Sequence, residues 1–221
     1  MTEKDCCKIF IIDDHTVVRE GLKKLINQEP DMMVCGEAED GPSAVNRLFD
    51  TKPDLVIVDI SLSSSNGIDL IKSMKLRYPD VPILVFSMHE ESVYAERALR
   101  AGASGYVMKF ATPAVLIEAI RKVRQGKIYL SEKITGKLLY KTIHKHGHEE
   151  EDSVGSLSDR EFQVFQMVGK GIPSRQIAQD LNLSIKTIDA FRENIKRKLG
   201  LNSAAELMYY AIEYVHSENL Q

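Results

Sequence analysis

Several features that would assign the protein to a special class are missing from its 221 residues. There is no tryptophan, and there are three cysteines, an odd number that includes the neighbours Cys6 and Cys7. A disulfide framework is therefore not expected, and a reducing cytoplasm is the compartment that fits. No apolar run approaches the ~20 residues that cross a bilayer, and the first residues lack the apolar stretch of a secretory signal. We expect neither a membrane protein nor a secreted one.

A strong charge of one sign is also absent. The chain has 29 basic and 32 acidic residues and a net charge of -3, and residues 157–221 carry as many acidic as basic residues. This balance excludes a polybasic tail and weakens, without excluding, an interaction with nucleic acid. The hydrophobic fraction of 43% is enough for a buried core, and the length fits one large domain or two small ones.

The first half of the sequence alternates short apolar runs with helix-length amphipathic segments. The runs are mostly aliphatic without polar alternation, which is typical of strands buried on both faces of a parallel sheet. They lie at 8–12, 32–36, 55–58, 83–86 and 105–108, and the helical segments lie at 16–28, 41–51, 67–77, 91–101 and 113–125. Five strand–helix repeats predict an α/β fold with a doubly wound, five-stranded parallel sheet.

The pattern changes after residue 128. A short amphipathic helix at about 131–144 and a polar tract to 156 indicate a linker helix followed by a flexible linker. From 157 onward the sequence predicts only helices, the first opened by a capping box of Ser158 and Glu161 and the third, at about 185–199, closed by Gly200. We therefore expect three parts, at 1–128, 129–156 and 157–221, the last a smaller all-helical domain.

Polar residues follow the apolar runs of the first half. Asp13 and Asp14 follow the first run, Asp59 the third, Ser87 the fourth and Lys109 the fifth. Because parallel strands end at one edge of a sheet, these side chains are expected to meet there. Clustered carboxylates favour Mg²⁺, and a carboxylate, a metal, a hydroxyl and a lysine together suit phosphoryl transfer. Each aspartate taken singly could instead be a helix N-cap.

The same residues resemble a known family. The segments 11–15 and 58–60, Ser87, and the segment from Gly105 to Lys109 resemble the receiver domain of two-component response regulators, which has a flavodoxin-like fold. The helical half resembles the LuxR-type helix-turn-helix, and the whole chain is similar to the NarL/FixJ class. One departure is Ser63, which stands where the family usually has a proline, so the loop after Asp59 is expected to be more flexible.

The resemblance implies a role for each receiver residue. Asp59 is the expected phosphoacceptor, and the metal ligands implied are Asp13, Asp14, Asp59 and the backbone carbonyl of Ser61. Lys109 would pair with the phosphoryl oxygens and Ser87 would bond one of them. The switch aromatic implied is Tyr106, which would turn inward when Ser87 moves; the alternative is an ordinary core aromatic.

The third predicted helix of the second half is the candidate for reading DNA. It carries an apolar stripe on one side and polar residues on the other, and it follows a short helix and a tight turn, as in a helix-turn-helix. A polar helical face is more often only a solvated surface. By the resemblance, the phosphate- and groove-facing residues would be Lys186, Thr187, Asp189, Ala190, Glu193, Lys196 and Arg197.

The favoured interpretation is a cytoplasmic response regulator rather than an enzyme. A sensor histidine kinase would phosphorylate Asp59 with Mg²⁺ bound, and the protein, as a homodimer, would then bind double-stranded DNA and regulate transcription. One alternative is a hydrolase with Asp59 as nucleophile. Such enzymes carry a second acid two residues after the nucleophile, and the presence of Ser61 at that position argues against this alternative. The other is an adaptor that never meets DNA, which a salt-dependent DNA shift lost on replacing Lys186 and Lys196 would exclude.

Overall fold

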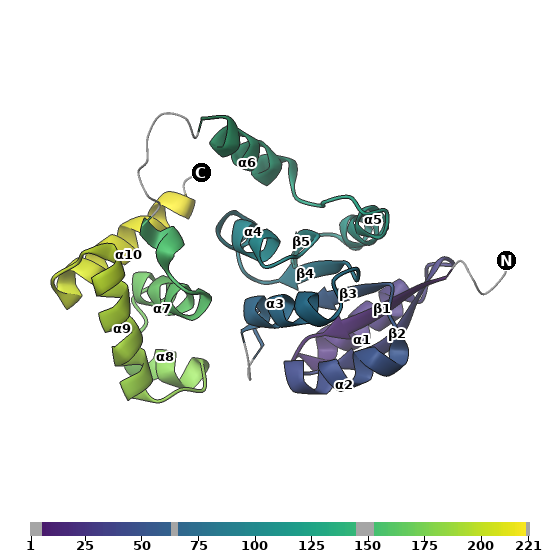
Figure 1. The fold of residues 1–221 in the computed structure, drawn as a ribbon, viewed down its shortest axis with the longest axis horizontal. Coiled ribbons are helices and arrows are strands. Elements are labelled where there is room, and N and C mark those ends of the chain that lie inside the picture. The colour runs from purple at the N-terminus through teal and green to yellow at the C-terminus, as the bar shows by residue number, and fades with distance from the viewer. Residues whose placement is uncertain (1–5, 63–65, 145–152, 220–221) are drawn as a thin grey trace. The chain divides into compact units, whose positions relative to one another are not determined.

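A computed structural model describes residues 6–62, 66–144 and 153–219 of the chain (Figure 1). The chain forms two compact units, Met1–Lys141 and Thr142–Gln221. Ser63, where the sequence departs from the receiver pattern, lies outside the described residues. Among the residues that are described, no helix has the length and apolar character needed to cross a membrane.

The first unit is built on one parallel sheet of five strands, as predicted. Its strands are β1 (Cys7–Ile12), β2 (Met32–Ala38), β3 (Leu55–Val58), β4 (Ile83–Ser87) and β5 (Gly105–Met108). They stand in the order β2-β1-β3-β4-β5, so the strand order reverses between β1 and β3, where doubly wound sheets place their ligand sites. The register of β1 against β2 shifts after Ile9, where Gly36 faces Phe10. A Cβ at Gly36 would lie 2.6 Å from the Phe10 ring, so the close packing needs glycine.

Helices cover both faces of this sheet (Figure 1). They are α1 (Thr16–Ile26), α2 (Gly41–Thr51), α3 (Gly67–Arg77), α4 (Glu91–Arg100) and α5 (Pro113–Arg124). The core on one face joins Leu22 and Ile26 of α1 and Ile120 of α5 to strand residues such as Ile9 and Ile57. The apolar runs therefore did locate the strands, and the helices begin where expected and end within one or two residues of the expected positions.

A helix and a short extended segment follow α5. Helix α6 spans Glu132–His144, in agreement with the helix predicted at 131–144. Before it, Tyr129 forms an isolated parallel bridge with Gly105 of β5. No sequence pattern indicated this bridge, because it is a single backbone pairing and not a strand.

The second unit contains helices around a small core. They are α7 (Asp159–Gly169), α8 (Ser174–Asp180), α9 (Ile185–Leu199) and α10 (Ala204–Asn219), preceded by a 3-10 helix, η2 (Ser153–Ser156). Ser158 and Glu161 form the predicted capping box, and Gly200 ends α9 in the left-handed conformation, with φ 67°.

Residues up to 156 were predicted to be linker, and the structure differs from this prediction at η2. Val154 is buried, and Leu157 donates its N–H to the Val154 carbonyl at 3.2 Å. One apolar residue in a polar tract carries no periodicity, so the sequence pattern could not reveal that it packs into the second unit.

Candidate functional site

The carboxyl ends of β1 and β3 bring three aspartates together. Asp13 and Asp14 follow β1, and Asp59 follows β3. The Asp59 N–H donates to the Ile12 carbonyl at 2.9 Å, which holds the two strand ends side by side. One ligand atom from each of Asp13, Asp14, His15 and Asp59 lies within 4.8 Å of the others. The expectation that these carboxylates would meet at the sheet edge agrees with this arrangement.

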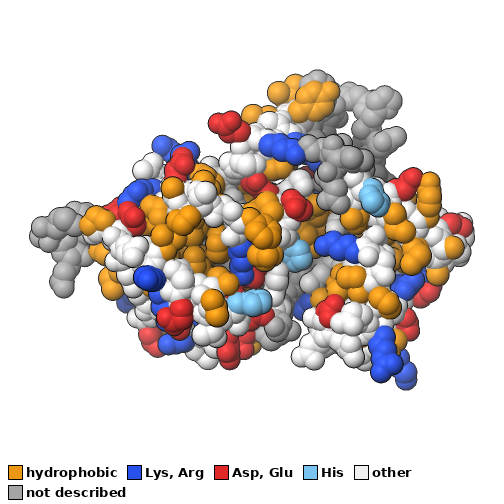
Figure 2. Space-filling view, turned by 180° about the vertical axis from the view of Figure 1, so that it is seen from behind, with side chains coloured by type: hydrophobic (Ala, Val, Ile, Leu, Met, Phe, Trp, Pro, Cys, Tyr) orange, Lys and Arg blue, Asp and Glu red, His pale blue; other side chains and the backbone are white. Residues whose placement is uncertain are grey.

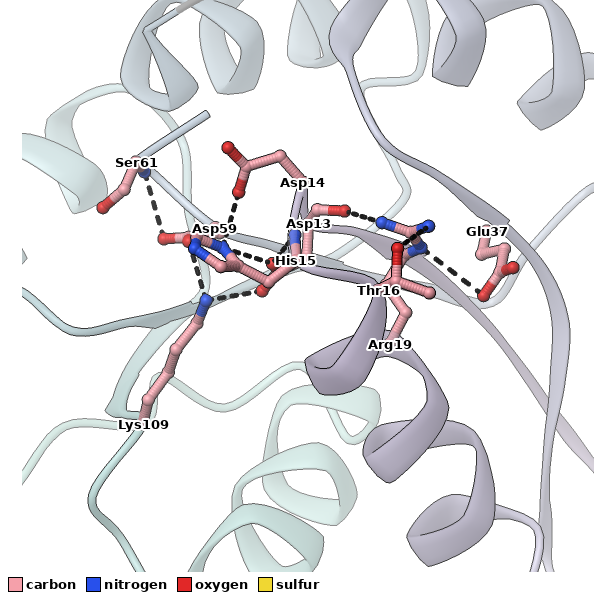
Figure 3. Close-up of polar contacts among 9 residues, drawn as sticks. All are labelled: Asp13, Asp14, His15, Thr16, Arg19, Glu37, Asp59, Ser61 and Lys109. Carbon is pink, nitrogen blue, oxygen red and sulfur yellow. Dashed lines mark hydrogen bonds and ion pairs between the residues drawn. The ribbon is translucent and has the colours of Figure 1, made fainter. Parts of the chain in front are cut away.

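Lys109 supplies the positive charge of the cluster. Its ammonium Nζ lies 2.6 Å from Asp13 Oδ2 and 2.7 Å from Asp59 Oδ2, and Figure 3 shows its side chain reaching the cluster from the chain that follows β5. Burial alone would lower the pKa of Lys109, but its hydrogen bonds to Asp13 and Asp59 outweigh burial and raise this pKa above its usual value. The lysine therefore stays charged and offsets two buried carboxylates.

Asp59 is buried, with 1% of its surface exposed, yet both of its oxygens are hydrogen-bonded. Oδ2 accepts from Lys109, and Oδ1 accepts from the Ser61 backbone N–H at 3.0 Å. Asp14 is more exposed than Asp13 or Asp59, with 17% of its side chain accessible. The cluster therefore opens to solvent on the side of Asp14.

Two residues near the cluster were not anticipated. The His15 N–H donates to Asp13 Oδ1 at 2.8 Å, and its ring Nδ1 lies 2.7 Å from Asp14 Oδ1. Arg19 is buried in α1 and donates to the Asp13 backbone carbonyl at 2.6 Å. Figure 3 shows Arg19 between the cluster and Glu37, and the Arg19 Nε lies 3.7 Å from Glu37 Oε2. An arginine one turn inside the helix that follows the acidic pair was the available signal.

The donor set fits magnesium. Three carboxylates offer hard oxygen ligands, an opening to solvent leaves room for the waters that Mg²⁺ retains, and a divalent ion would relieve the repulsion among the aspartates. An imidazole such as that of His15 is a ligand that Mg²⁺ does not prefer. We therefore take the three carboxylates, without His15, as the candidate metal ligands.

Ser87 and Tyr106 lie next to this site on β4 and β5. Both are buried, and the Ser87 hydroxyl accepts from the His89 N–H at 3.3 Å. The Tyr106 hydroxyl donates to the His89 carbonyl at 2.9 Å, and burial raises the pKa of this phenol well above its usual value. The Tyr106 side chain thus already occupies the inward position, and the loop after β4 joins it to Ser87.

Helices α8 and α9 form the helix-turn-helix of the second unit. They are joined through residues 181–184, where Asn182 has a positive φ of 53°. Ser184 caps α9 by accepting the Thr187 N–H at 3.1 Å. Arg192 donates to the Ser174 hydroxyl at 2.7 Å, which ties α9 to the first residue of α8. Arg192 therefore has a structural partner, a role that its place on the polar face did not predict.

The face of α9 opposite its buried residues is open to solvent. Ile188 and Ile195 are buried, whereas the exposed residues of the predicted set are Lys186, Asp189, Ala190, Glu193 and Arg197. Thr187 and Lys196 are half-buried, and Lys196 pairs with Glu193 at 2.9 Å. Figure 2 shows basic and acidic side chains intermixed on the face in view, consistent with the balanced composition.

Comparison with known families gives two matches that cover most of the chain. Residues 9–121 match the family described as "Response regulator receiver domain". Residues 155–211 match the family described as "Bacterial regulatory proteins, luxR family".

Individual relatives and solved structures agree with these families. The chain is 33% identical over 219 residues to the transcriptional regulatory protein DegU of Brevibacillus brevis, covering 93% of each chain. It is 35% identical over 211 residues to the oxygen regulatory protein NreC of Staphylococcus carnosus, covering 93% of this chain and 97% of that one. The structure of RcsB from Salmonella enterica serovar Typhimurium, bound to promoter rprA in the presence of the phosphomimetic BeF3-, matches with 28% identity, a TM-score of 0.62 and coverage of 93% and 98%.

Proposed function

The chain belongs to the response regulators that join a receiver domain to a LuxR-type DNA-binding domain, and from this premise we propose that phosphorylation of Asp59 by a sensor histidine kinase switches its binding to DNA. The observation that carries the proposal is the contact of a buried, hydrogen-bonded Asp59 with Lys109 and the other two aspartates. Phosphoryl transfer is catalysed mainly by positioning and electrostatic stabilisation, which this arrangement of charged groups can supply.

The transfer uses one oxygen of Asp59. That oxygen attacks the phosphorus of a phosphohistidine, a new oxygen–phosphorus bond forms, the nitrogen–phosphorus bond breaks, and the leaving imidazole takes up a proton from water. Lys109 already contacts Asp59 at 2.7 Å and shifts its hydrogen bond to a phosphoryl oxygen. The ammonium thereby balances charge that spreads over the transferred group.

The proposed metal site consists of Asp13, Asp14, Asp59 and the backbone carbonyl of Ser61. A bound Mg²⁺ supplies positive charge to the phosphoryl oxygens. Arg19 holds the Asp13 backbone through the carbonyl, and His15 holds the Asp13 carboxylate through its backbone N–H. These contacts keep the aspartates oriented before the phosphodonor arrives.

Phosphorylation then changes the surface around β4 and β5. The Ser87 hydroxyl leaves the His89 N–H and bonds a phosphoryl oxygen, and the His89 loop follows. Because Tyr106 is bonded to the carbonyl of His89, this movement alters the packing of the aromatic side chain. A two-state surface of this kind is the switch.

The output is sequence-specific DNA binding through α9. Near the start of the helix, Lys186 and Thr187 contact phosphates. The residues that face the major groove are Asp189, Ala190 and Glu193. Further contacts to the DNA backbone come from Lys196 and Arg197. A helix N-terminus binds phosphate oxygens favourably, and a carboxylate such as that of Glu193 can accept a hydrogen bond from the amino group of cytosine. The similar RcsB structure is a complex with promoter DNA, and this likeness supports the assignment.

Assembly and location complete the proposal. We assign the receiver to 1–128, the linker helix and linker to 129–156 and the DNA-binding domain to 157–221. Few basic residues face outward on α9. The affinity for DNA therefore comes from a homodimer that forms on phosphorylation and binds two half-sites. The protein acts in the cytoplasm. It is not a turnover enzyme, because Ser61 occupies the position where a hydrolase would need its second acid.

The test of the acceptor is incubation with acetyl phosphate and Mg²⁺ followed by intact-mass measurement. We expect one phosphoryl group on the wild type, none on Asp59→Asn, and one on the control Asp50→Asn, whose carboxylate is exposed on α2. The bond is acyl phosphate, so hydroxylamine should remove it. Hydroxylamine-sensitive phosphorylation of Asp59→Asn at the wild-type level would show that another residue is the acceptor.

A further inference from the structure

The N-terminus of α6 has a cap that is divided between two helices. Ser131 occupies the N-cap position: its hydroxyl accepts the Ile134 N–H at 3.4 Å, and its carbonyl accepts the Thr135 N–H at 2.9 Å. The N–H of Ser131 itself donates to Glu91 Oε1 at 2.8 Å. Glu91 is the first residue of α4, 40 positions earlier in the chain.

A self-contained cap in the same protein shows what is unusual here. At α7 the hydroxyl of Ser158 accepts from the Glu161 N–H, and the Glu161 carboxylate returns to the Ser158 N–H at 2.8 Å. In such a capping box the glutamate stands three residues after the N-cap. In α6 that position is Ile134, whose side chain cannot accept a hydrogen bond, and Glu91 of α4 takes over the role.

Burial makes the shared cap matter energetically. Glu91 is 9% exposed. If its carboxylate lost the hydrogen bond from Ser131, a largely buried acceptor would be left without this partner, and the free energy of the folded state would rise by the cost of desolvating it. Hydrogen bonds to ionised groups are stronger than neutral ones. The position of α4 is therefore coupled to the start of α6.

The proposed switch residue contacts the same segment through its backbone. The Tyr106 N–H donates to the Tyr129 carbonyl at 2.9 Å, and the Tyr129 N–H donates to the Ser104 carbonyl at 3.0 Å. Gly105 permits this approach, because a Cβ there would lie 2.9 Å from the Tyr129 carbonyl oxygen. The segment leading into α6 is thus held at β5 by Tyr106 and at α4 by Glu91.

The hydroxyl of Tyr106 closes the connection to α4. It bonds to the His89 carbonyl, and the His89 ring stacks on Tyr94 of α4 with centroids 4.6 Å apart. Any rearrangement of the loop after β4 therefore reaches both attachments of the segment before α6. Figure 1 shows this segment running from the end of α5 back toward α4.

We propose that Glu91 is a positioning residue that holds the N-terminus of α6, and that this shared cap carries the phosphorylation signal from α4 to the helix between the two domains. The signalling role rests on the proposed function of Asp59. When Ser87 and the His89 loop shift, α4 withdraws Glu91, the Ser131 N–H loses its acceptor, and the first turn of α6 loosens.

The cap is tested first, in the full-length protein without a phosphodonor, by hydrogen exchange over residues 128–137. We expect the Ser131 amide and the first turn of α6 to exchange at least about tenfold faster in Glu91→Ala, because a charge-assisted hydrogen bond is lost. Glu91→Gln, whose amide oxygen can accept the same bond, and Glu90→Ala, an exposed neighbour, should exchange like the wild type. Wild-type exchange in Glu91→Ala would overturn the proposal.

The signal is tested second, with acetyl phosphate and Mg²⁺. Exchange at the same amides should rise on phosphorylation in the wild type and in Glu90→Ala. It should rise no further in Glu91→Ala, although intact mass should report phosphorylation of all three proteins. Unchanged exchange in phosphorylated wild type, or a full response in Glu91→Ala, would overturn the coupling and leave the proposed function standing. Lack of any phosphorylation would instead count against the proposed function. Unchanged exchange in β1–β4 shows that each variant is folded. If Glu91→Ala does not fold, Glu91→Leu, which keeps much of the side-chain bulk but has no hydrogen-bond acceptor, replaces it with the same expected result.

Discussion

Asp59 is buried, and both of its carboxylate oxygens are hydrogen-bonded, as a buried carboxylate requires. Lys109 supplies the compensating charge, because its ammonium lies between Asp59 and Asp13 at 2.7 and 2.6 Å. An unpaired buried charge would raise the free energy of the folded state. Removing one partner of a buried ion pair therefore destabilises a protein by more than the intact pair stabilises it. Three carboxylates face one ammonium in this cluster, so an excess of negative charge remains, and Asp14 is its more exposed carboxylate.

A divalent cation should therefore stabilise the receiver. We expect the free energy of unfolding of the wild type to increase with Mg²⁺ concentration, by ~2.7 kcal/mol when the ion is present at about 100 times its dissociation constant. Asp14→Asn removes the carboxylate on the solvent side of the cluster, so most of this increment should disappear. Urea unfolding at several Mg²⁺ concentrations is the measurement.

The matched control for the metal is Asp50→Asn, which removes an exposed aspartate of α2. It should keep the whole Mg²⁺ increment. If Asp14→Asn gained as much stability from Mg²⁺ as Asp50→Asn, the acidic cluster would not be the metal site.

At the residue scale the sequence predicted the reactive groups better than their supports. Asp13, Asp59 and Lys109 could be placed together because each directly follows a recognisable buried strand. Arg19 and His15 could not, because their roles depend on which backbone carbonyl or carboxylate a side chain reaches after folding. The one available signal was the position of Arg19, one turn inside the helix that follows the acidic pair, and this position does not by itself show whether the arginine is buried or solvated.

Among the helices, an ion pair joins α7 to α9. Lys198 Nζ lies 2.6 Å from Glu161 Oε2, and the same carboxylate caps α7 through Ser158. Burial favours the neutral form of Glu161, but the hydrogen bonds from Lys198 and Ser158 outweigh it and lower the pKa of Glu161 below 4.5. The carboxylate therefore favours the folded state only when it is ionised.

The sign of the pH dependence follows from this lowered pKa. The contribution of Glu161 is fully present above the ordinary glutamate pKa of the unfolded chain, and it is lost as the pH falls through the lower folded-state pKa. Glu161→Gln should cost about 1–3 kcal/mol at neutral pH and flatten the loss of stability below pH 4.5. Hydrogen exchange of the α7 amides in the full-length protein measures both effects.

A suitable comparison is Glu213→Gln, since Glu213 is exposed and bonds only to the exposed Tyr209 among the contacts described. This variant should follow the wild-type pH profile. An equal acid sensitivity of wild type and Glu161→Gln would contradict the role given to the capping carboxylate.

Helix α9 carries the prediction for DNA. Replacing Lys186 and Lys196 together by alanine should weaken binding at every sequence tested and reduce the slope of log affinity against log salt by about 2, since each lost phosphate contact contributes about 1. Lys170→Ala, a control in the exposed C-cap of α7, should leave the slope unchanged. A slope unaltered by the double substitution would remove α9 from the interface.

Elements were predictable to the extent that their signals are local. The strands, the capping box of α7 and the end of α9 at Gly200 follow from patterns within a few residues. The cap of α6 could not be predicted in this way, because its acceptor Glu91 lies far from Ser131 in the chain. Val154 in η2 was missed for a related reason, since its apolar surroundings come from helices that follow it.

The whole molecule consists of two compact units, with the acidic site in the first and the helix-turn-helix in the second. In the proposed function the receiver chemistry changes the charge at the acidic site. Residues 157–221 carry as many acidic as basic residues, so the affinity of this unit for DNA is expected to be sensitive to assembly. The central claim is therefore that the state of Asp59 sets the DNA affinity of the other unit.

The most direct test is DNA affinity measured at one salt concentration, on sequences first selected by the phosphorylated protein. For the wild type, acetyl phosphate with Mg²⁺ should tighten binding at least about tenfold, equivalent to ~1.4 kcal/mol, and Asp59→Asn should remain at the affinity of the unphosphorylated wild type. The same affinity with and without phosphorylation of Asp59, or an equal gain in Asp59→Asn, would contradict the account.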